Sequence, residues 1–396
     1  MKKYLRLVTG LTLVMVAAGT NAANVQLGII LGFTGPIESL TPQMSAGAEL
    51  AIKEASESGL FLDGSSITAV KADSTCIDSA AATAAAERLV TADRVQGIIG
   101  ADCSGVTGAI LQQVVRPNGI VMISPSATSP GLSTAEDDGL FFRTAPSDAR
   151  QGEVMTGVIM DRGIKQVAVT YTNNDYGKGL ADAFESAFRV AGGEVTISAS
   201  HEDGKADYAS EIGALASAGG EALVVAGYLD QGGLGIIQGS LDADAFSTFV
   251  LPDGMIGEAL VEAIGPDLDG SFGQHPSAEG PGAAMIAKLG QENGFNGDSP
   301  FVAESYDAAA LIILAMQAAG SSDSMAYQQK VMEVANAPGE KIYPGDLAKA
   351  LQILQDGGEV DYDGASAVEL IGPGESAGNY REIEVKDSAI TTVRYR

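Results

Sequence analysis

Residues 25–36 read VQLGIILGFTGP, an apolar run that ends in a turn rich in glycine and closed by a proline. The apolar run predicts a buried strand. Thr41 and Pro42 suit the N-cap and first turn of a helix that we expect to end near Ser56. A second run with β-branched residues covers Ile67–Ala72. A strand, a helix and a strand in this order are typical of a βαβ unit and predict an α/β fold with parallel strands.

The same alternation continues along the chain and divides it into two halves. Before residue 144 we expect two more strands, at 95–100 and 120–124, with a helix at 105–115 between them. After residue 144 the rhythm restarts, with strands expected at 166–171, 194–200, 222–226 and 248–251. Helices at 280–293, 303–319 and 324–336 and strands at 367–371 and 380–385 are expected to complete the pattern.

A chain of 396 residues exceeds what one hydrophobic core usually serves. We therefore expect two doubly wound, Rossmann-like lobes. Residues 23–144 and about 275–355 are assigned to lobe 1, and residues 145–274 and about 356–396 to lobe 2.

The first 22 residues predict a signal peptide. Lys2, Lys3 and Arg6 precede an uncharged apolar run over residues 7–19, and small residues then favour cleavage after Ala22. The apolar run is short for a membrane span, and no cysteine near the cut offers a site for a lipid anchor. We expect an exported, periplasmic protein; a disordered or cytosolic N-terminus is the alternative.

Composition restricts the possible partners and activities. The net charge of −28 argues against nucleic acid or anionic lipid as a partner, because both are bound through Lys and Arg. The two histidines, His201 and His275, stand apart from any catalytic or metal-binding motif. We therefore expect no catalytic residue, no metal and no cofactor, and we disfavour the alternative of an exported hydrolase.

Cys76 and Cys103 are the two cysteines of the chain. An oxidising compartment favours a disulfide between them. A free thiol nucleophile is the alternative.

Ligands of open α/β sheets bind beyond the carboxyl ends of the strands, so the loops at these ends are the candidate site. In the first half, Ser104 follows one strand at the start of a helix, where it either binds an anion or caps the helix. The loop Ser126-Ala127-Thr128 lies between two prolines that hold it extended. Its hydroxyls and carbonyls are available to a ligand, unless it is an ordinary surface turn.

In the second half, Tyr176, Tyr228 and Asp253 follow three successive predicted strands. The tyrosines suit the lining of a pocket and the aspartate suits a cationic group, although packing and a Pro-Asp-Gly turn are the simpler explanations. Anion-binding groups on one lobe that face a carboxylate and aromatic rings on the other predict a cleft for a zwitterion.

Short motifs distributed along nearly the whole chain resemble the periplasmic binding proteins of branched-chain amino-acid ABC transporters, which have the type I periplasmic binding protein fold. The motifs are Phe33-Thr34-Gly35-Pro36, Cys76 with Cys103-Ser104, Ile123–Thr128, Phe142-Arg143-Thr144, Asp175–Gly179, Tyr306-Asp307-Ala308 and Tyr362–Ala365.

The resemblance implies two lobes joined by three crossover strands that close on a ligand by a hinge. It implies that Ser104 and Thr128 bind a ligand carboxylate and that the Ser126 backbone and Asp253 bind an ammonium group. Asp253 departs from the glutamate common in amino-acid binders. We expect a monomer that delivers a small amino acid, with branched-chain types favoured, to a membrane permease. An amide, a polyamine or an aromatic acid as ligand, or presentation to a separate sensor, is the alternative.

Overall fold

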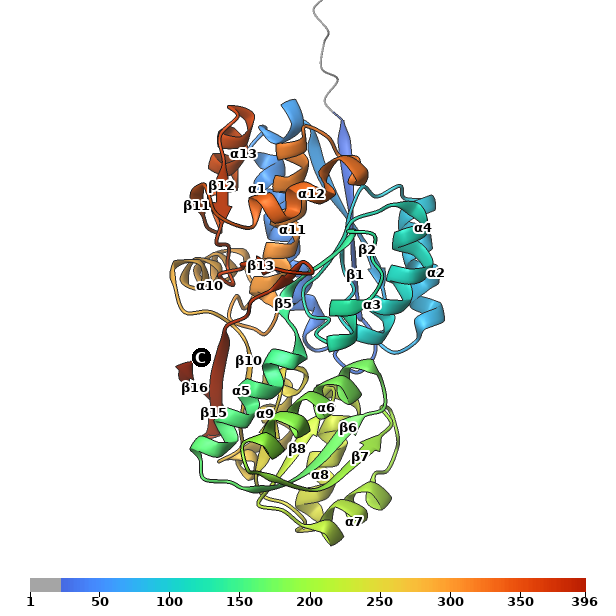
Figure 1. Ribbon diagram of the computed structural model, residues 1–396, viewed down its shortest axis with the longest axis vertical. Helices are drawn as coiled ribbons and strands as arrows, with labels where there is room; N and C mark the ends of the chain where they lie inside the picture. The colour runs from blue at the N-terminus through green and yellow to red at the C-terminus, as the bar shows by residue number, and fades with distance from the viewer. Residues whose placement is uncertain (1–22) are drawn as a thin grey trace, which may run out of the picture.

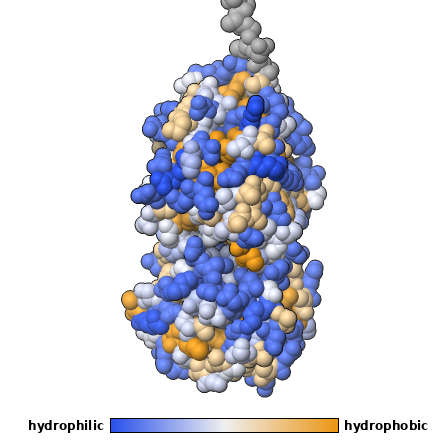
Figure 2. All heavy atoms as spheres, turned by 90° about the vertical axis from the view of Figure 1, so that its right-hand side faces the viewer, coloured by the Kyte–Doolittle hydropathy of each residue, from blue (hydrophilic) through white to orange (hydrophobic). Residues whose placement is uncertain are grey.

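The computed structural model describes residues 23–396, and these form two lobes stacked along the long axis of the molecule (Figure 1). The predicted signal peptide, residues 1–22, lies outside the described residues. The lobes meet at a narrower waist, and hydrophilic side chains cover much of the face shown in Figure 2.

The first lobe is built on a seven-stranded sheet in the order β13-β14-β5-β4-β3-β1-β2. Its strands are β1 (Asn24–Leu31), β2 (Ser66–Asp73), β3 (Ile98–Gly100), β4 (Met122–Ser124), β5 (Phe141–Pro146), β13 (Leu370–Ile371) and β14 (Glu375–Ser376). The five strands β1 to β5 pair with one another in parallel, as the βαβ pattern predicts. The helices of this lobe are α1 (Thr41–Glu57), α2 (Ser79–Thr91), α3 (Ser104–Ile110), α4 (Arg116–Asn118), α10 (Pro281–Asn293), α11 (Val302–Ala319), α12 (Ser324–Val334) and α13 (Leu347–Gln355).

The second lobe repeats this architecture with a sheet in the order β16-β15-β10-β9-β8-β6-β7. Its strands are β6 (Gln166–Thr172), β7 (Glu194–His201), β8 (Ala222–Ala226), β9 (Phe249–Leu251), β10 (Phe272–Pro276), β15 (Tyr380–Lys386) and β16 (Ala389–Tyr395). Its helices are α5 (Asp148–Asp161), α6 (Asp175–Val190), α7 (Ala209–Ala218), α8 (Leu234–Asp242) and α9 (Glu258–Ile264).

The chain passes between the lobes three times. It leaves the first sheet after β5 to enter α5, returns after β10 to α10, and crosses again between β14 and β15. The expected α/β fold with two doubly wound lobes and three crossovers is thereby confirmed.

The boundary expected near residue 356 is wrong. A small parallel ladder pairs β11 (Glu340–Ile342) with β12 (Val360–Tyr362), and β13 and β14 lie at the edge of the first sheet. Residues up to Ser376 therefore belong to the first lobe, and the second lobe receives only the β15–β16 hairpin from this part of the chain. The reason is that β14 pairs with β5, a contact between residues more than 200 positions apart that local sequence does not reveal.

The helix α11 forms the centre of the first lobe. Among the described residues it is the one helix whose length and composition would suit a membrane span, yet 83% of it is buried inside the protein. Buried residues occur on every face of α11, and α1 and α12 pack beside it. A helix that is apolar all round in this way is a core helix of the lobe.

The predicted disulfide is present between Cys76 and Cys103. These residues follow β2 and β3, the two strands that flank β1 in the sheet. The bond therefore ties together two loops at the carboxyl edge of the first sheet.

Candidate ligand-binding cleft

Loops at the carboxyl edges of the two sheets meet across the waist. The backbone N–H of Asp230, after β8, donates to the carbonyl of Pro36 at 2.9 Å, and the N–H of Ser39, after β1, donates to the Asp230 carboxylate at 2.8 Å. The structure therefore has the lobes in contact, in a closed arrangement.

On the first lobe, hydrogen bonds hold the loop after β4 in a defined shape. The Ser124 hydroxyl accepts from the N–H of Ala127 at 2.9 Å, and the Ser126 hydroxyl donates to the carbonyl of Asp102 at 3.1 Å. The Ser104 hydroxyl accepts from the N–H of Ser129 at 3.1 Å, so the two predicted loops are joined. The Thr128 hydroxyl is buried and has no hydrogen-bond partner among the described residues.

On the second lobe, the three predicted residues contact one another. The Tyr176 hydroxyl donates to Asp253 at 2.6 Å, and the Tyr176 and Tyr228 rings stack with centroids 5.0 Å apart. The N–H of Gly254 also donates to the Asp253 carboxylate, at 2.9 Å. A Cβ at position 254 would lie 2.8 Å from the Tyr176 hydroxyl, so this close approach requires glycine.

Asp148 is a site residue that sequence reasoning missed. It is the first residue of α5, and its N–H donates to the carbonyl of Thr128 at 2.8 Å. Both of its carboxyl oxygens are buried without a hydrogen-bond partner among the described residues. Burial raises the pKa of Asp148 well above its ordinary value and the charge of Asp253 raises it further, while Thr128 lowers it. Asp148 therefore lies close to predicted residues of both lobes.

Gln151, three residues after Asp148 in α5, is a second residue of this region that sequence reasoning missed. Its amide is buried and unpartnered, and it lies near Asp253. Burial raises the pKa of Asp253, while the Tyr176 hydroxyl and then Gln151 lower it. An acidic residue in the first turn of a helix is common for electrostatic reasons alone, so the sequence carries no signal that separates Asp148 from an ordinary helix start.

The other crossovers also contribute buried polar groups. The amide of Gln274 in β10 and the hydroxyl of Tyr380 in β15 have no partner among the described residues. Burial raises the pKa of Tyr380 well above its ordinary value, and the charges of Asp148 and Asp253 raise it further. The first and third crossovers therefore place Asp148 and Tyr380 in the same buried region as Asp253.

Several carboxyl groups act on the Tyr228 side of this region. Burial raises the pKa of Tyr228 well above its usual range, and the charges of Asp203, Asp102, Asp253 and Asp148 add to the shift, in that order. Asp102 has partners of its own, because it accepts from the N–H of Gly32 at 2.6 Å and from Ser74 at 2.9 Å.

A pocket of about 400 Å³ opens between the lobes. None of the seven predicted ligand-binding residues lines it, but its lining residues Gly105 and Asp175 directly follow Ser104 and directly precede Tyr176, respectively, in the chain. Its walls come from both lobes and consist of Cys76, Ile77, Ser79, Gly105, Val106, Thr172, Asn173, Asn174, Asp175, Glu202 and Asp203.

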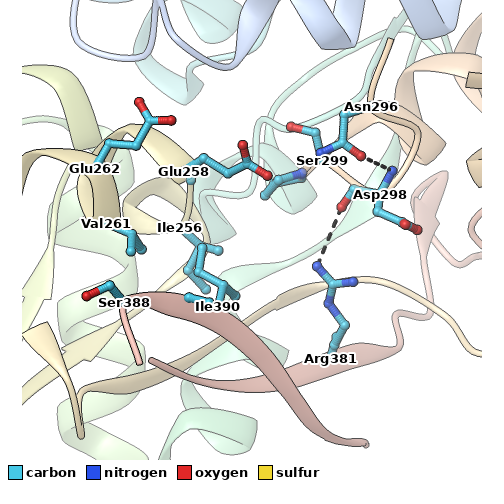
Figure 3. A pocket seen from close by; sticks show the side chains of 13 residues that line it. Ile256, Glu258, Val261, Glu262, Asn296, Asp298, Ser299, Arg381, Ser388 and Ile390 are labelled. Atoms are coloured by element: carbon cyan, nitrogen blue, oxygen red, sulfur yellow. Dashed lines mark hydrogen bonds between the residues drawn. The ribbon is translucent and has the colours of Figure 1, made fainter. Parts of the chain in front are cut away.

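A second pocket, of about 560 Å³, lies elsewhere between the lobes (Figure 3). It is bounded by α9 and the β15–β16 hairpin on one lobe and by the 296–300 loop on the other. Arg381 points toward this loop, donates to the Asp298 carbonyl at 3.5 Å and donates to His275 at 3.0 Å. The pocket contains none of the predicted ligand-binding residues, so we do not assign the ligand to it.

Across residues 23–396, no group of three or more His, Cys, Asp or Glu side chains is placed to hold a metal ion. The polar groups of the cleft are hydroxyls, amides, carboxyls and backbone groups, which suit a small organic ligand.

Known proteins with this sequence pattern are binding proteins. The family model described as periplasmic binding protein matches residues 24–346. The Leu/Ile/Val-binding protein homolog 1 of Brucella melitensis is 32% identical over 347 residues, which cover 86% of this chain and 89% of the relative.

Solved structures share the fold. A leucine-binding protein from Thermotoga maritima matches with a TM-score of 0.79 at 21% identity, over 94% of this chain and 98% of that chain. A solute-binding protein of an ABC transporter from R. palustris, solved with benzoate, matches with a TM-score of 0.75 at 19% identity, over 94% and 96% of the two chains. The chain belongs to the periplasmic binding protein family.

Proposed function

We propose that this protein is the exported solute-binding component of an ABC transporter and that it carries a small amino-acid-like ligand to a membrane permease. The observation that carries the proposal is the buried meeting of Thr128 and Asp148 with Tyr176 and Asp253 where the two lobes join. Polar groups from both lobes at one point are what a ligand enclosed by lobe closure requires.

The proposed ligand is an amino acid or a similar zwitterion. Its carboxylate is assigned to the hydroxyls of Ser104 and Thr128, and Thr128 is the better supported because its hydroxyl lacks another partner. Its ammonium group is assigned to Asp253 and to the backbone of the Ser126-Ala127-Thr128 loop. Tyr176 and Tyr228 would line the space beside it. The hydrogen bond between Tyr176 and Asp253 is the contact that such an ammonium group would share or replace.

Closure explains how binding is coupled to transport. The contacts of Asp230 with Pro36 and Ser39 link the lobes in the closed state. A ligand that contacts both lobes stabilises that state over an open one, and only such differential binding shifts the equilibrium. Delivery then requires the permease to open the cleft.

The names of the relatives indicate which classes of ligand to test first. The Brucella melitensis relative is named for leucine, isoleucine and valine, which makes branched-chain amino acids the first compounds to test. The R. palustris protein was solved with benzoate, an acid that has no ammonium group. We further propose a monomeric protein of the periplasm, without catalytic activity.

A thermal-shift screen of the protein from Ala23 onward tests the proposed function. The screen should contain branched-chain and other amino acids, small amides, diamines and benzoate. A ligand that binds the folded state raises the melting temperature in proportion to the logarithm of its excess over Kd. We expect compounds with an ammonium group to raise it. A rise with benzoate alone would contradict the assignment of Asp253, and turnover of any compound would contradict a pure binding role.

A further inference from the structure

We propose that the cleft selects a ligand with a net positive charge, such as a diamine, a guanidino-amine or a basic amino acid, and that Asp148 is a second ligand-binding carboxylate beside Asp253. The inference rests on the proposed function, because it concerns the same cleft. It goes further by naming the charge class of the ligand and a residue that binds it.

The first argument is that the two carboxylates have no cation of their own. Asp148 and Asp253 are at most 1% exposed. The Arg143 guanidinium, the closest positive group acting on Asp148, is already engaged. It donates to the carbonyls of Ala127 and Ser129 at 3.0 and 2.9 Å and to the Glu375 carboxylate at 2.5 Å.

The second argument is that neutral polar groups around these carboxylates also lack partners. The Thr128 hydroxyl lies against Asp148, and the Gln151 amide lies against Asp253. Both side chains are at most 1% exposed, and neither of these two contacts has the geometry of a full hydrogen bond. Buried polar groups are nearly always hydrogen-bonded, so donors and acceptors left open around two carboxylates indicate a place for a polar ligand.

The third argument is the aromatic pair. The ring of Tyr176 stacks on that of Tyr228, and its hydroxyl donates to Asp253 at 2.6 Å, so the aromatic pair lies beside this carboxylate. The charges of both aspartates raise the pKa of the two tyrosines. The face of a tyrosine ring attracts ammonium and guanidinium groups and disfavours anions. Rings and carboxylates together form surroundings suited to cationic nitrogen.

The fourth argument is the mouth of the cleft. The 400 Å³ pocket between the lobes is lined by Asp175, Glu202 and Asp203, and no Lys, Arg or His is among its lining residues. A concave surface with charges of one sign concentrates ions of the other sign and accelerates their association. The pocket of Figure 3 differs, because Arg381 stands in it together with Glu258 and Glu262. Because Asp298 also lines that pocket, both pockets have three acidic lining residues, and the 400 Å³ pocket is distinguished by the absence of a cation from its lining residues.

The balance of charges then favours a cation over a neutral zwitterion. Burial raises the pKa of both carboxyls and the charge of Asp253 raises that of Asp148 further, so the pair retains a proton, and the single ammonium group of leucine compensates only the one carboxylate that is ionised. A ligand with a second cationic nitrogen compensates both, and burial makes such compensation important. Benzoate adds a negative charge to the pair and should be rejected.

Calorimetric titration of the protein from Ala23 onward tests the charge class. The cationic probes are L-lysine, L-arginine and 1,4-diaminobutane; L-leucine and benzoate are the comparison probes, all at one ionic strength. We expect at least one cationic probe to bind 10-fold or more tightly than leucine, and benzoate not to bind. Leucine binding as tightly as every cationic probe overturns the inference and leaves the proposed function standing. Absence of binding by all cationic probes also overturns the inference, and binding of benzoate alone overturns both.

Two variants test the residue. Asp148→Asn should weaken the binding of the best cationic probe about 100-fold. The ratio of the affinity for this probe to the affinity for leucine should then change by at least 10-fold. A residue that only positions Thr128 would weaken all probes alike, so an unchanged ratio overturns the role of Asp148. Glu87→Gln removes an exposed carboxylate of α2 that does not line the pocket and is the matched control, with unchanged affinity expected. The ligand-free melting temperature of Asp148→Asn should equal or exceed that of the parent, which shows that the variant folds.

Discussion

The backbone N–H of Ser39 donates a 2.8 Å hydrogen bond to the Asp230 carboxylate, although 191 positions separate these residues in the chain. Ser39 lies on the first lobe and Asp230 on the second, and the N–H of Asp230 returns a hydrogen bond to Pro36. The pair therefore links the two lobes across the waist, and we expect this latch to break when the lobes separate.

Removing this latch should favour the open protein. For Asp230→Ala we expect ligand affinity to fall roughly fivefold, which corresponds to about 1 kcal/mol for one partly exposed hydrogen bond to a charged group. Titration calorimetry measures the affinity, and small-angle scattering of the ligand-free protein should show a larger radius of gyration. Asp230→Asn keeps an acceptor oxygen, so its ligand affinity should lie between that of Asp230→Ala and that of the parent. Equal affinity in all three proteins would show that the latch does not bias closure.

Asp253→Ala should weaken the binding of an α-amino-acid ligand by several kcal/mol, because it leaves a buried ammonium group without its carboxylate. Tyr176→Phe removes the hydroxyl that donates to Asp253 and should have a smaller effect. Calorimetry on both purified variants measures the difference. Unchanged affinity in the alanine variant would remove Asp253 from the ligand site.

Replacing both cysteines by alanine should lower the free energy of unfolding by about 3–4 kcal/mol, as the chain-entropy model gives for a loop of this length. Cys76 and Cys103 are 27 positions apart and tie the loops after β2 and β3. Urea unfolding of the variant and the parent measures the change. A parent protein treated with a reducing agent is the control and should resemble the variant. An unchanged unfolding midpoint would show that packing alone holds these loops.

Glu304 should make the protein less stable as the pH rises. Burial in α11 raises its pKa to about 8 from an ordinary value near 4.5, so the folded state holds a proton that the unfolded state has released between these values. Stability from this group is complete below pH 4.5 and is lost toward pH 8, at about 1.4 kcal/mol per pH unit for one proton. Glu304→Gln does not titrate. The urea unfolding midpoints of the parent, measured at pH 5, 6, 7 and 8, should approach those of the Glu304→Gln variant as the pH falls. The same difference between the two proteins at every pH would contradict this pKa.

The succession of strands along the chain could be predicted because each apolar run lies between recognisable helix and turn signals. The pairing of Cys76 with Cys103 followed from the expected oxidising compartment and from the presence of two cysteines, and the structure confirms it. β13 and β14 were placed in the wrong lobe because strands of two residues carry no periodicity. Their position depends on β5, which is distant in sequence.

The site was partly accessible to sequence reasoning. Tyr176, Tyr228 and Asp253 were predicted to lie together from their places after successive strands, and the structure brings them into contact. Asp148, Gln151, Gln274 and Tyr380 lie at or beside the three crossovers, where the path of the chain between the lobes decides which side chains converge. No local pattern marks such residues, because their neighbours come from other parts of the chain.

The last crossover has a consequence for biosynthesis. β14 pairs with β5 and β15 pairs with β10, so each sheet incorporates residues from the 375–386 segment. Neither lobe acquires its final sheet until the ribosome has made this segment, whereas consecutive domains can fold one after another during translation. Completion of both sheets is thus postponed to the same late moment of synthesis.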